Sequence, residues 1–380
     1  MTQGFSYWEQ SSFLSGYDVL IVGSGIVGLS TALHLKISQP KLKIGVLEAG
    51  FLPSGASTKN AGFACFGSIS EGLDKLESMS EDEFLQVVEM RWKGLAKLRK
   101  NLGDDALDFK QWNGYEIFRK EDAVFSALCV EKIDYFNHLL KPIIGKSDIY
   151  SVDRSKLAEF ELGGIDTLIK NKYEAQIDTG KMMTAFLYKV QGLGVSVFNT
   201  CSVKKIHRNS TEITLETNQG NFSTKRVILT TNAFTSGFYP QLNVEPGRGQ
   251  VLITEPIDGL KIKGTFHYDR GYYYFRNINN RILLGGGRNL DFETERTTQA
   301  GITDIVQNSL EKMLHEVIIP NRKVKIEQRW SGVMGFGDQL KPIIQELEPD
   351  IFCGVRCNGM GVAIGSLVGE QVADLALNSF

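Results

Sequence analysis

The chain has 380 residues, and its 42 basic and 44 acidic side chains leave a formal net charge of −2. This balance gives no support for a nucleic-acid partner, because nucleic-acid binders normally carry a basic surplus or a basic patch. No apolar run approaches the roughly 18 residues of a membrane-spanning segment, so we expect no span. Hydrophobic residues make up 42% of the chain, and its length suggests two domains with a core each.

Glycine is in excess and cysteine is scarce. The chain has 39 glycines, whereas a usual content of roughly 7% would give about 27. Five cysteines at irregular spacing predict neither a disulfide framework nor a zinc site, and we expect no metal. Residues 1–16 lack the basic and apolar regions of a signal peptide. Together these features predict a cytoplasmic protein in a reducing compartment.

The first informative segment is a short apolar run that leads into a glycine-rich turn. Residues 17–22 have the β-branched composition of a buried parallel strand, and residues 29–36 have the pattern of a helix. Between them lies a G-x-G-x-x-G motif, and residues 43–47 form a second predicted strand that ends at Glu48. This order of strand, glycine turn, helix, strand and acid predicts a Rossmann-like dinucleotide-binding unit rather than an ordinary glycine-rich turn.

Each part of this unit has a physical task at a dinucleotide. Gly23 permits the tight turn, Gly25 lets a pyrophosphate approach the backbone, and Gly28 lets the helix pack closely on the strand. The helix N-terminus offers free N–H groups and the positive end of a dipole. Glu48 accepts hydrogen bonds from ribose hydroxyls, and its charge disfavours a 2′-phosphorylated cofactor. The other candidates in this unit are Ser24, Ile26, Val27 and Ala49.

The motif alone does not distinguish FAD from NAD, but two later segments favour FAD. A small polar loop follows the second strand and can lie along a pyrophosphate, a ribityl chain and a flavin ring. Near the C-terminus, a strand-like run at residues 351–355 precedes a glycine-rich turn and a helix that ends near Leu377. This second helix N-terminus suits the negative charge that develops on a reduced flavin. The candidates are Gly55, Ala56, Ser57, Thr58, Lys59, Asn60, Ala61 and Gly62 in the loop, and Gly359, Met360, Gly361, Val362 and Ala363 in the turn.

Over nearly its whole length the chain resembles the FAD-dependent D-amino acid oxidase and glycine/sarcosine oxidase superfamily. Ser6-Tyr7-Trp8-Glu9, together with the loop at residues 55–62, is similar to the γ-glutamylputrescine oxidase-like subgroup, which acts on amines. A hydrophobic plug for the first domain is an equally good interpretation of Tyr7 and Trp8. The matching segments are residues 17–35, 47–63, 175–184, 227–233, 247–256, 271–287, 329–343 and 354–377.

The resemblance implies a fold that is α/β plus α+β: a discontinuous Rossmann-like FAD-binding domain and an interposed substrate domain with a mixed sheet. We expect residues 1–75, 172–235 and 326–380 in the first domain, and residues 76–171 and 236–325 in the second. The resemblance also places Val203 near the adenine, and it adds Thr231, Asn232, Ala233 and Gly332 to the cofactor set.

Local patterns predict the elements of these domains. Helices are expected over residues 81–102 and 121–140. Short strands that suit a small antiparallel sheet are expected over residues 203–207 and 212–217. The substrate sheet is expected to contain residues 249–253, 272–276, 281–284 and 324–330.

The reaction that the resemblance implies is oxidation of a C–N bond. A hydride passes from the carbon beside the nitrogen to flavin N5, and the resulting imine is hydrolysed to a carbonyl product. Leu283 stands where sarcosine oxidases have an oxygen-activating lysine, so oxygen and another electron acceptor both stay open. Lys59 is the candidate catalytic cation beside the flavin ring, and a solvated loop lysine is an equally good interpretation.

Substrate recognition departs from the amino-acid oxidases. Those relatives hold the substrate carboxylate with an arginine where this chain has Met334, and glycine oxidases have a second arginine where it has Cys357. Without a bidentate arginine, we expect an amine, or a molecule whose carboxylate is far from the oxidised carbon. Arg276, Arg329 and Arg356 remain as arginines that would restore a carboxylate site.

An aromatic strand completes the candidate substrate site. Tyr272 and Tyr274 alternate along the predicted strand at residues 272–276 and are expected on one face. Tyr272 matches a family position that lines the substrate site, whereas a sheet-core aromatic ladder is the alternative. Aromatic walls suit an aliphatic amine, neutral or charged.

Three other readings of the sequence stay open. They are an NAD-dependent dehydrogenase, a superfamily member that acts on a hydroxy acid or an α-amino acid, and a non-catalytic flavoprotein. Covalent flavin attachment in sarcosine oxidases uses a cysteine after the W-x-G segment, and residues 333–341 contain none. We therefore expect non-covalent FAD, and the sequence leaves the oligomeric state open.

Overall fold

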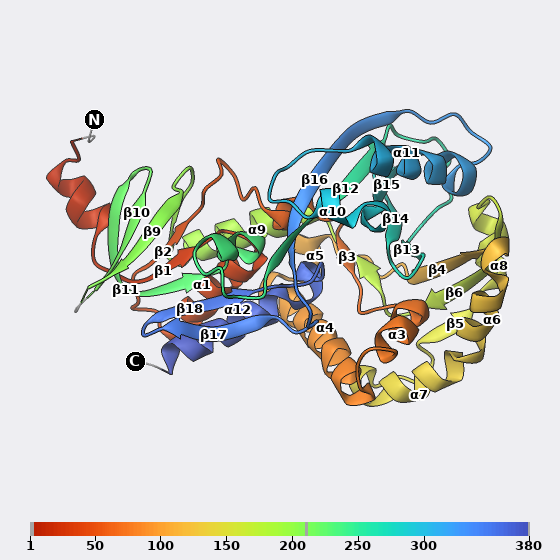
Figure 1. The fold of residues 1–380 in the computed structure, drawn as a ribbon, viewed down its shortest axis with the longest axis horizontal. Coiled ribbons are helices and arrows are strands. Elements are labelled where there is room, and N and C mark those ends of the chain that lie inside the picture. The colour runs from red at the N-terminus through yellow and green to blue at the C-terminus, as the bar shows by residue number, and fades with distance from the viewer. Residues whose placement is uncertain (1–3, 210–211, 379–380) are drawn as a thin grey trace.

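The computed structural model of the chain describes residues 4–209 and 212–378. Two eight-stranded sheets dominate this part of the chain and lie toward opposite ends of the long axis (Figure 1). A pair of two-residue strands, β3 (Phe63–Ala64) and β7 (Ala175–Gln176), lies between them. Within the described residues, no helix combines the length and the apolar composition needed to cross a bilayer.

The first sheet has a parallel core around β1 (Tyr17–Val22), in which every residue except Asp18 is buried. Strands covered on both faces need such continuous apolar runs. Because the core strands are parallel, their carboxyl ends lie at one edge, and the loops that follow them meet there. In spatial order the parallel strands are β8 (Ser196–Phe198), β2 (Ile44–Leu47), β1, β11 (Gly220–Leu229) and β18 (Ile351–Val355).

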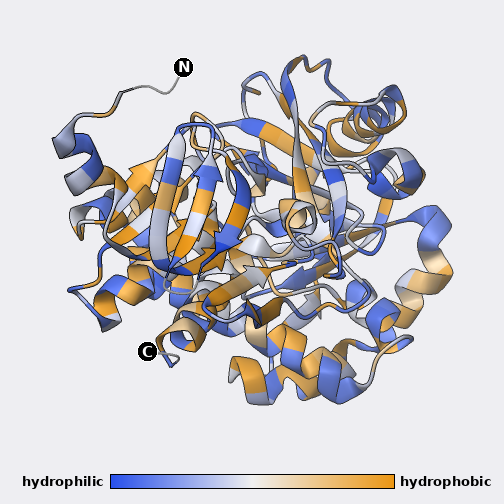
Figure 2. Cartoon of the chain, turned by 60° about the vertical axis from the view of Figure 1, so that its left-hand side comes forward, coloured by the Kyte–Doolittle hydropathy of each residue, from blue (hydrophilic) through white to orange (hydrophobic). Residues whose placement is uncertain are grey.

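Three antiparallel strands extend this sheet, namely β17 (Ile343–Glu348), β9 (Val203–Arg208) and β10 (Ile213–Thr217). Buried and partly exposed residues alternate along β10, as expected for a strand with one face toward the core. Figure 2 shows the same alternation of hydrophobic and hydrophilic residues on the strands that face the viewer at this end. The two short antiparallel strands expected from the sequence are therefore present.

Helices α1 (Ile26–Ser38) and α12 (Gly361–Leu377) pack side by side and run in the same direction. A Cβ on Gly365 would stand 2.7 Å from Ile26 Cγ2, and at the other end His34 Nε2 lies 2.7 Å from Asp374 Oδ1. Both helices therefore begin at the edge where β1 and β18 end. Further helices around this sheet are α9 (Thr179–Gly192), α4 (Glu81–Leu102) and α5 (Asp104–Leu107).

The second sheet is antiparallel except where β13 pairs with β4. One face carries α11 (Asp304–Met313), which buries Leu310 against Leu252, Phe275 and Leu284. The strands, in spatial order, are β16 (Ile326–Phe336), β12 (Glu245–Thr254), β15 (Arg281–Gly286), β14 (Tyr273–Ile278), β13 (Thr265–Tyr268), β4 (Gly114–Arg119), β6 (Ile165–Asn171) and β5 (Tyr150–Val152).

The remaining elements are short helices and turns at the ends of these strands. They are η1 (Glu9–Leu14), α2 (Ala56–Lys59), α3 (Ile69–Leu76), η2 (Lys120–Asp122), α6 (Ala123–Glu131), α7 (Ile133–Ile144), α8 (Arg154–Phe160), η3 (Asn232–Gly237), η4 (Arg288–Leu290), α10 (Phe292–Glu295) and η5 (Leu314–Ile318).

The expectation of one helix over residues 121–140 is wrong. The backbone leaves the helical region at Lys132, which ends α6 and begins α7. The two helices bury different amounts of surface: α7 buries four large apolar residues, whereas α6 buries only Ser126 and Cys129 and leaves Val124 exposed. A break at Lys132 lets α7 turn its apolar face onto the core without α6.

One further element differs from its expected position. β14 begins at Tyr273, so Tyr272 lies in the turn before the strand rather than in it. β16 belongs to the second sheet, as expected for residues 324–330, and it continues in that sheet to Phe336. The domain boundaries themselves stay a prediction, and residues 1–3, 210–211 and 379–380 within them lie outside the described residues.

Candidate active site

The turn between β1 and α1 depends on glycine for its shape. Gly23 has a φ of +103°, which L side chains rarely adopt. A Cβ on Gly28 would stand 2.7 Å from Thr230 Oγ1 and closer still to Gly23 O, so only glycine lets α1 begin here. The N-cap residue Gly25 has no side chain to cap the helix, and Ile26 N instead donates to Ser57 Oγ at 2.9 Å. The start of α1 thus faces the loop at residues 55–62.

Glu48 lies beside this turn, and its buried carboxylate joins two loops. Ser24 donates to Oε2 from its backbone N at 3.0 Å and from its hydroxyl at 2.6 Å. Gly50 N donates to Oε1 at 2.9 Å, and Ser54 Oγ lies 3.3 Å from the same oxygen. Ala49 follows on the surface. Glu48 therefore lies at the glycine turn, as its spacing from that turn in the sequence predicts. Its hydrogen bonding to a ribose stays a prediction.

The loop at residues 55–62 contacts both the start of α1 and the second sheet. Lys59 ends the short helix α2, rather than lying in an open loop, and its carbonyl accepts from Trp330 Nε1 at 2.9 Å. A Cβ on Gly332 would stand 2.7 Å from Lys59 Cβ, so this helix rests directly on β16. Asn60 Oδ1 accepts from Gly62 N at 2.8 Å and closes the loop.

The ends of β11 and β18 are joined at the same edge. Asn232 Oδ1 accepts from Arg356 N at 3.0 Å and from Cys357 N at 3.2 Å, and these bonds hold the turn that leads into α12. Met360 caps α12 without a side-chain hydrogen bond, and a Cβ on Gly361 would meet open space. This junction is bordered on one side by the first turn of α12, which includes Val362 and Ala363. On the other side lie Thr231 and Ala233, just after the end of β11. Val203 begins β9 and is buried.

These features fit the dinucleotide that the resemblance implies. Two parallel helices begin at one edge, and the N-cap residue of neither forms a side-chain hydrogen bond with its helix. Gly25 is the N-cap residue of α1, Gly361 is the first residue of α12, and the Glu48 carboxylate stands beside the start of α1. N–H groups and dipoles directed at one edge form the kind of site that binds anions such as a pyrophosphate.

The face of the second sheet that lies opposite α11 contacts these loops. Ala61 packs with Val251 and Leu283, and Tyr274 and Trp330 border this cluster. The ring of Tyr274 covers Gly285, where a Cβ would stand 2.6 Å from it, and burial raises the pKa of Tyr274 to about 12. Tyr274 is thus a neutral phenol in an apolar wall.

Of the three arginines that the sequence left as candidates for binding a carboxylate, two already donate hydrogen bonds to other groups of the protein. Arg329 lies on the opposite face of β16 from Trp330 and donates to Gln307 and Glu311 of α11, at 2.6 Å each. Arg356 donates to the carbonyls of Lys341 at 2.9 Å and of Asn243 at 3.1 Å.

The third, Arg276, is 2% exposed and donates from Nε to Ala61 O. Burial lowers the pKa of Arg276 to about 10, with distant Asp178 and Asp108 opposing the shift. Because Ala61 belongs to the loop at residues 55–62, this hydrogen bond from Arg276 helps to hold that loop in place.

Met334 and Cys357, expected together at the substrate site, lie in different surroundings. Met334 faces the loop before α12, and a Cβ on Gly359 would stand 3.8 Å from its Sδ. Cys357 is 6% exposed and packs in the apolar core that α1 and α12 share, where burial raises its pKa to about 12. The structure therefore brings Met334, and not Cys357, to the face that meets the loops.

A row of side chains borders Met334, and sequence reasoning missed its central member, Arg288. The ring centroid of Tyr272 lies 6.0 Å from that of Phe292, and Arg288 Cζ lies 4.8 Å from the Phe292 centroid and 4.0 Å from that of Phe336. The Phe336 ring in turn lies 3.8 Å from a Cβ placed on Gly359. We call these four side chains, Tyr272, Phe292, Arg288 and Phe336, the Arg288 row.

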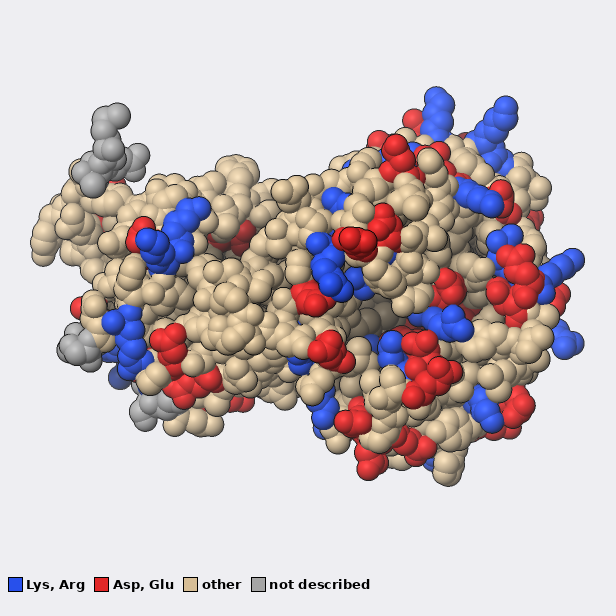
Figure 3. Space-filling view, viewed as in Figure 1, with Lys and Arg blue, Asp and Glu red and all other residues tan. Residues whose placement is uncertain are grey.

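A signal for Arg288 was present in the sequence. It follows the glycines Gly285, Gly286 and Gly287 at the end of a strand, and Gly286 and Gly287 have φ values of +124° and +74°. Consecutive glycines of this kind turn the chain sharply at a sheet edge, where functional side chains concentrate. The molecular surface is hollowed near its middle, and charged side chains of both signs gather on the rim of the hollow (Figure 3).

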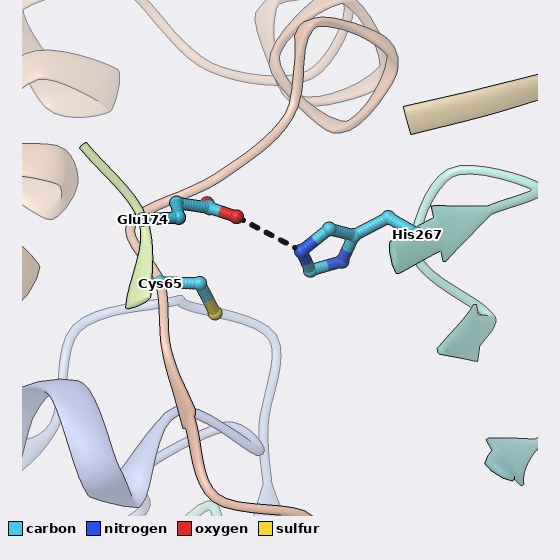
Figure 4. A group of neighbouring side chains, drawn as sticks. All are labelled: Cys65, Glu174 and His267. Carbon is cyan, nitrogen blue, oxygen red and sulfur yellow. Dashed lines mark hydrogen bonds and ion pairs between the residues drawn. The ribbon is translucent and has the colours of Figure 1, made fainter. Parts of the chain in front are cut away.

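A second cluster that sequence reasoning did not predict joins Cys65, Glu174 and His267 (Figure 4). Glu174 Oε2 lies 3.2 Å from His267 Nε2, and Glu174 Oε1 accepts from Phe66 N and Gly67 N at 3.3 Å each. Burial acts to lower the pKa of His267, but the Glu174 carboxylate and its hydrogen bond raise the pKa above the usual value.

The His267 cluster borders the aromatic wall. The His267 ring lies 5.3 Å from Phe63, which lies 5.6 Å from Tyr274. Among the described residues, a small cavity of about 10 Å³ adjoins His267, Glu174 and Glu116. That volume corresponds to about one water molecule.

Known proteins resemble the chain over most of its length. Gamma-glutamylputrescine oxidoreductase of Escherichia coli (strain K12) is 25% identical over 374 residues, which cover 94% of this chain and 83% of that protein. Glycine oxidase of Bacillus licheniformis is 21% identical over 371 residues, covering 96% and 94%. The solved structure of glycine oxidase from Bacillus cereus matches with a TM-score of 0.76 at 16% identity, covers 96% of this chain and 98% of that one, and confirms the expected fold.

A family model described as FAD dependent oxidoreductase (DAO) matches residues 18–375. This range includes both sheets, the two helix starts and the Arg288 row. The chain therefore belongs to the DAO family of FAD-dependent oxidoreductases.

Proposed function

We propose that the protein oxidises the C–N bond of an amine to an imine that hydrolyses to a carbonyl product, and that its substrate carries no carboxylate on the oxidised carbon. The chain belongs to the DAO family of FAD-dependent oxidoreductases, and the gamma-glutamylputrescine oxidoreductase and glycine oxidase that resemble it support an amine or amino acid as the substrate. The narrower substrate class is supported by the side chains around the candidate site.

The observation that carries the proposal is the surroundings of Met334. The resemblance puts the carboxylate-binding arginine at this position, and here a thioether faces the loop before α12. Arg329 and Arg356 do not replace it, because their guanidinium groups already donate to Glu311 and to backbone carbonyls. A thioether and aromatic rings favour an apolar segment beside the reacting carbon over a charged one.

The chain's own groups would divide the work as follows. The starts of α1 and α12 and the Glu48 carboxylate would hold the FAD, whose flavin ring supplies the two-electron oxidant. The positive end of the α12 dipole would stabilise negative charge on that ring. Lys59, on α2 beside β16, would add a cation, while Tyr272 and Tyr274 would confine the amine. We also propose a cytoplasmic location, supported by five buried cysteines without a disulfide in a described range that includes all of them.

The test is an anaerobic screen at the visible flavin band with polyamines, N-acylated polyamines, N-methyl amino acids and D-amino acids. The proposal predicts bleaching by members of the first two groups. Best reduction by glycine, sarcosine or a D-amino acid would contradict the substrate class. No bleaching by any nitrogen compound would favour a non-catalytic flavoprotein, and a protein purified without a flavin band would favour a nicotinamide enzyme.

A further inference from the structure

Arg288 is a cation without a polar protein partner. Among residues 4–209 and 212–378, no hydrogen bond or ion pair of its guanidinium is found, and its contacts are the rings of Phe292 and Phe336. Burial lowers the pKa of Arg288, with the more distant Tyr272 and Glu295 acting against that shift. An arginine stacked on an aromatic ring still presents a row of N–H donors along its edge.

Two acids near Arg288, Glu295 and Glu245, already pair with other arginines. Glu295 is fully buried, and both its oxygens accept from Arg248, at 2.7 and 3.0 Å. Glu245 lies 3.3 Å from the guanidinium of Arg296. Neither Glu295 nor Glu245 therefore forms an ion pair with Arg288.

The position of Arg288 ties it to the candidate substrate space. Its Nη1 would stand 2.9 Å from a Cβ on Gly247, and the Phe336 ring that it stacks on reaches the loop before α12 at Gly359. Phe336 is two residues beyond Met334 on the same face of β16. Two residues of a strand span about 7 Å, so the cation lies displaced along the strand from the position of the missing arginine.

We propose that Arg288 binds a carboxylate at the far end of the substrate, so that the preferred substrate is an amine whose carboxylate is several bonds from the oxidised carbon. This inference rests on the proposed function, which identifies the oxidised end of the substrate as an amine. Arg288 would make paired hydrogen bonds to the anion, while the Phe292 and Phe336 rings hold the guanidinium in place.

The experiment measures binding of an anion that cannot be oxidised. Pentanoate and its neutral analogue pentanamide are titrated into the oxidised FAD-loaded protein by calorimetry. We expect the wild type to bind pentanoate roughly 10- to 100-fold more tightly than pentanamide, as for a charge-assisted pair of hydrogen bonds. Equal binding of the two probes, or no binding of pentanoate, would overturn the inference.

Variants locate the preference on one side chain. Arg288→Gln should abolish the preference for pentanoate, and Arg288→Lys should keep part of it, because lysine retains the charge but loses the fork. Arg281→Gln is the matched control, at the start of the strand that precedes Arg288, since Arg281 pairs with Glu327 at 2.7 Å. An unchanged preference in Arg288→Gln, or its loss in Arg281→Gln alone, would contradict the assignment.

Further measurements distinguish loss of the anion site from misfolding and from failure of the proposed reaction. Flavin content and thermal midpoint report whether Arg288→Gln is folded, and if it is not, the probe pair in the wild type and in Arg288→Lys decides. Pentanoate binding through Arg288 without flavin reduction by any amine would support the anion site and refute the proposed reaction. Amine oxidation with no pentanoate preference would refute the anion site alone.

Discussion

Glu48 shows how one buried carboxylate organises the first loop of the sheet edge. It accepts hydrogen bonds from Ser24 N, Ser24 Oγ and Gly50 N. Glu48→Gln keeps the shape but turns an amide N–H toward one of these donors and removes the charge. We expect FAD to bind about tenfold more weakly or worse, from the worth of hydrogen bonds to a charged acceptor. Titration of the apoprotein with FAD, followed by flavin fluorescence, measures this.

The control for this prediction is an acid of the same type far from the loop. Glu121 is exposed and pairs with Arg119 at 2.9 Å, so Glu121→Gln should leave FAD affinity unchanged. Wild-type affinity in Glu48→Gln would mean that the carboxylate orders the loops without contributing to the cofactor site.

His267 gives a prediction about pH. Burial opposes its charge, but Glu174 raises the folded-state pKa above the unfolded value of about 6.5. Its protonation therefore stabilises the fold fully below pH of about 6.5, and this stability is lost as pH rises through the folded pKa. The thermal midpoint of the wild type should exceed that of His267→Gln most at pH 6, and by less at pH 9.

The double variant isolates the pair behind that pH dependence. Replacing His267 in a Glu174→Gln background should cost more nearly the same at pH 6 and pH 9, because Glu174 acts more strongly than Glu116 and Glu71 among the groups that raise the pKa. A difference between wild type and His267→Gln that grows with pH would contradict the assignment of a protonated His267.

At the scale of elements, the α1 and α12 contact brings the two helix starts to one edge. A Cβ on Gly369 would stand 2.6 Å from Ser30 Cβ and 2.7 Å from Val27 O. Gly369→Ala should separate the helices and destabilise the protein by about 1–3 kcal/mol, as overpacking of a tight core does. Thermal unfolding of the FAD-loaded protein gives the change.

Gly192 supplies the matched helix glycine. It ends α9, and a Cβ there would meet no atom within 4 Å. Gly192→Ala should be neutral or slightly stabilising, because alanine has the higher helix propensity. Equal effects of the two substitutions would show that the contact between α1 and α12 is not under packing constraint.

Local sequence signals were sufficient where an element is set by its own residues. α4 has the bounds that its periodicity predicts, and Glu48 lies beside the glycine turn as the spacing requires. Local sequence signals failed where tertiary contacts determine the bounds of an element. The break at Lys132 depends on which face α7 buries, and the start of β14 at Tyr273 depends on pairing with β13.

The candidate site was predictable in part for the same reason. The loops that we propose to bind the cofactor carry motifs of contiguous residues, whereas the Arg288 row is assembled from the β14 turn, η4, α10 and β16. No spacing rule links Arg288 to Phe336. Likewise, only the sheet shows that Arg329 faces Glu311 rather than the loops, because that depends on the register of β16.

For the whole molecule, the account predicts FAD that is held without a covalent bond. All five cysteines, which lie within the described residues, are buried, and residues 333–341 contain none. Precipitation with trichloroacetic acid should leave a colourless pellet and release the flavin to the supernatant. A yellow pellet would contradict non-covalent binding.

The loop at residues 55–62, which we propose to bind the cofactor, rests on β16 of the second sheet. We therefore assign the chemistry to the first sheet and its loops, and substrate recognition to the second sheet. The most direct test of this account is the rate of anaerobic flavin reduction, measured by stopped flow, with 5-aminopentanoate and with glycine. The account predicts that 5-aminopentanoate reduces the flavin and that glycine does so far more slowly. Faster reduction by glycine would contradict it.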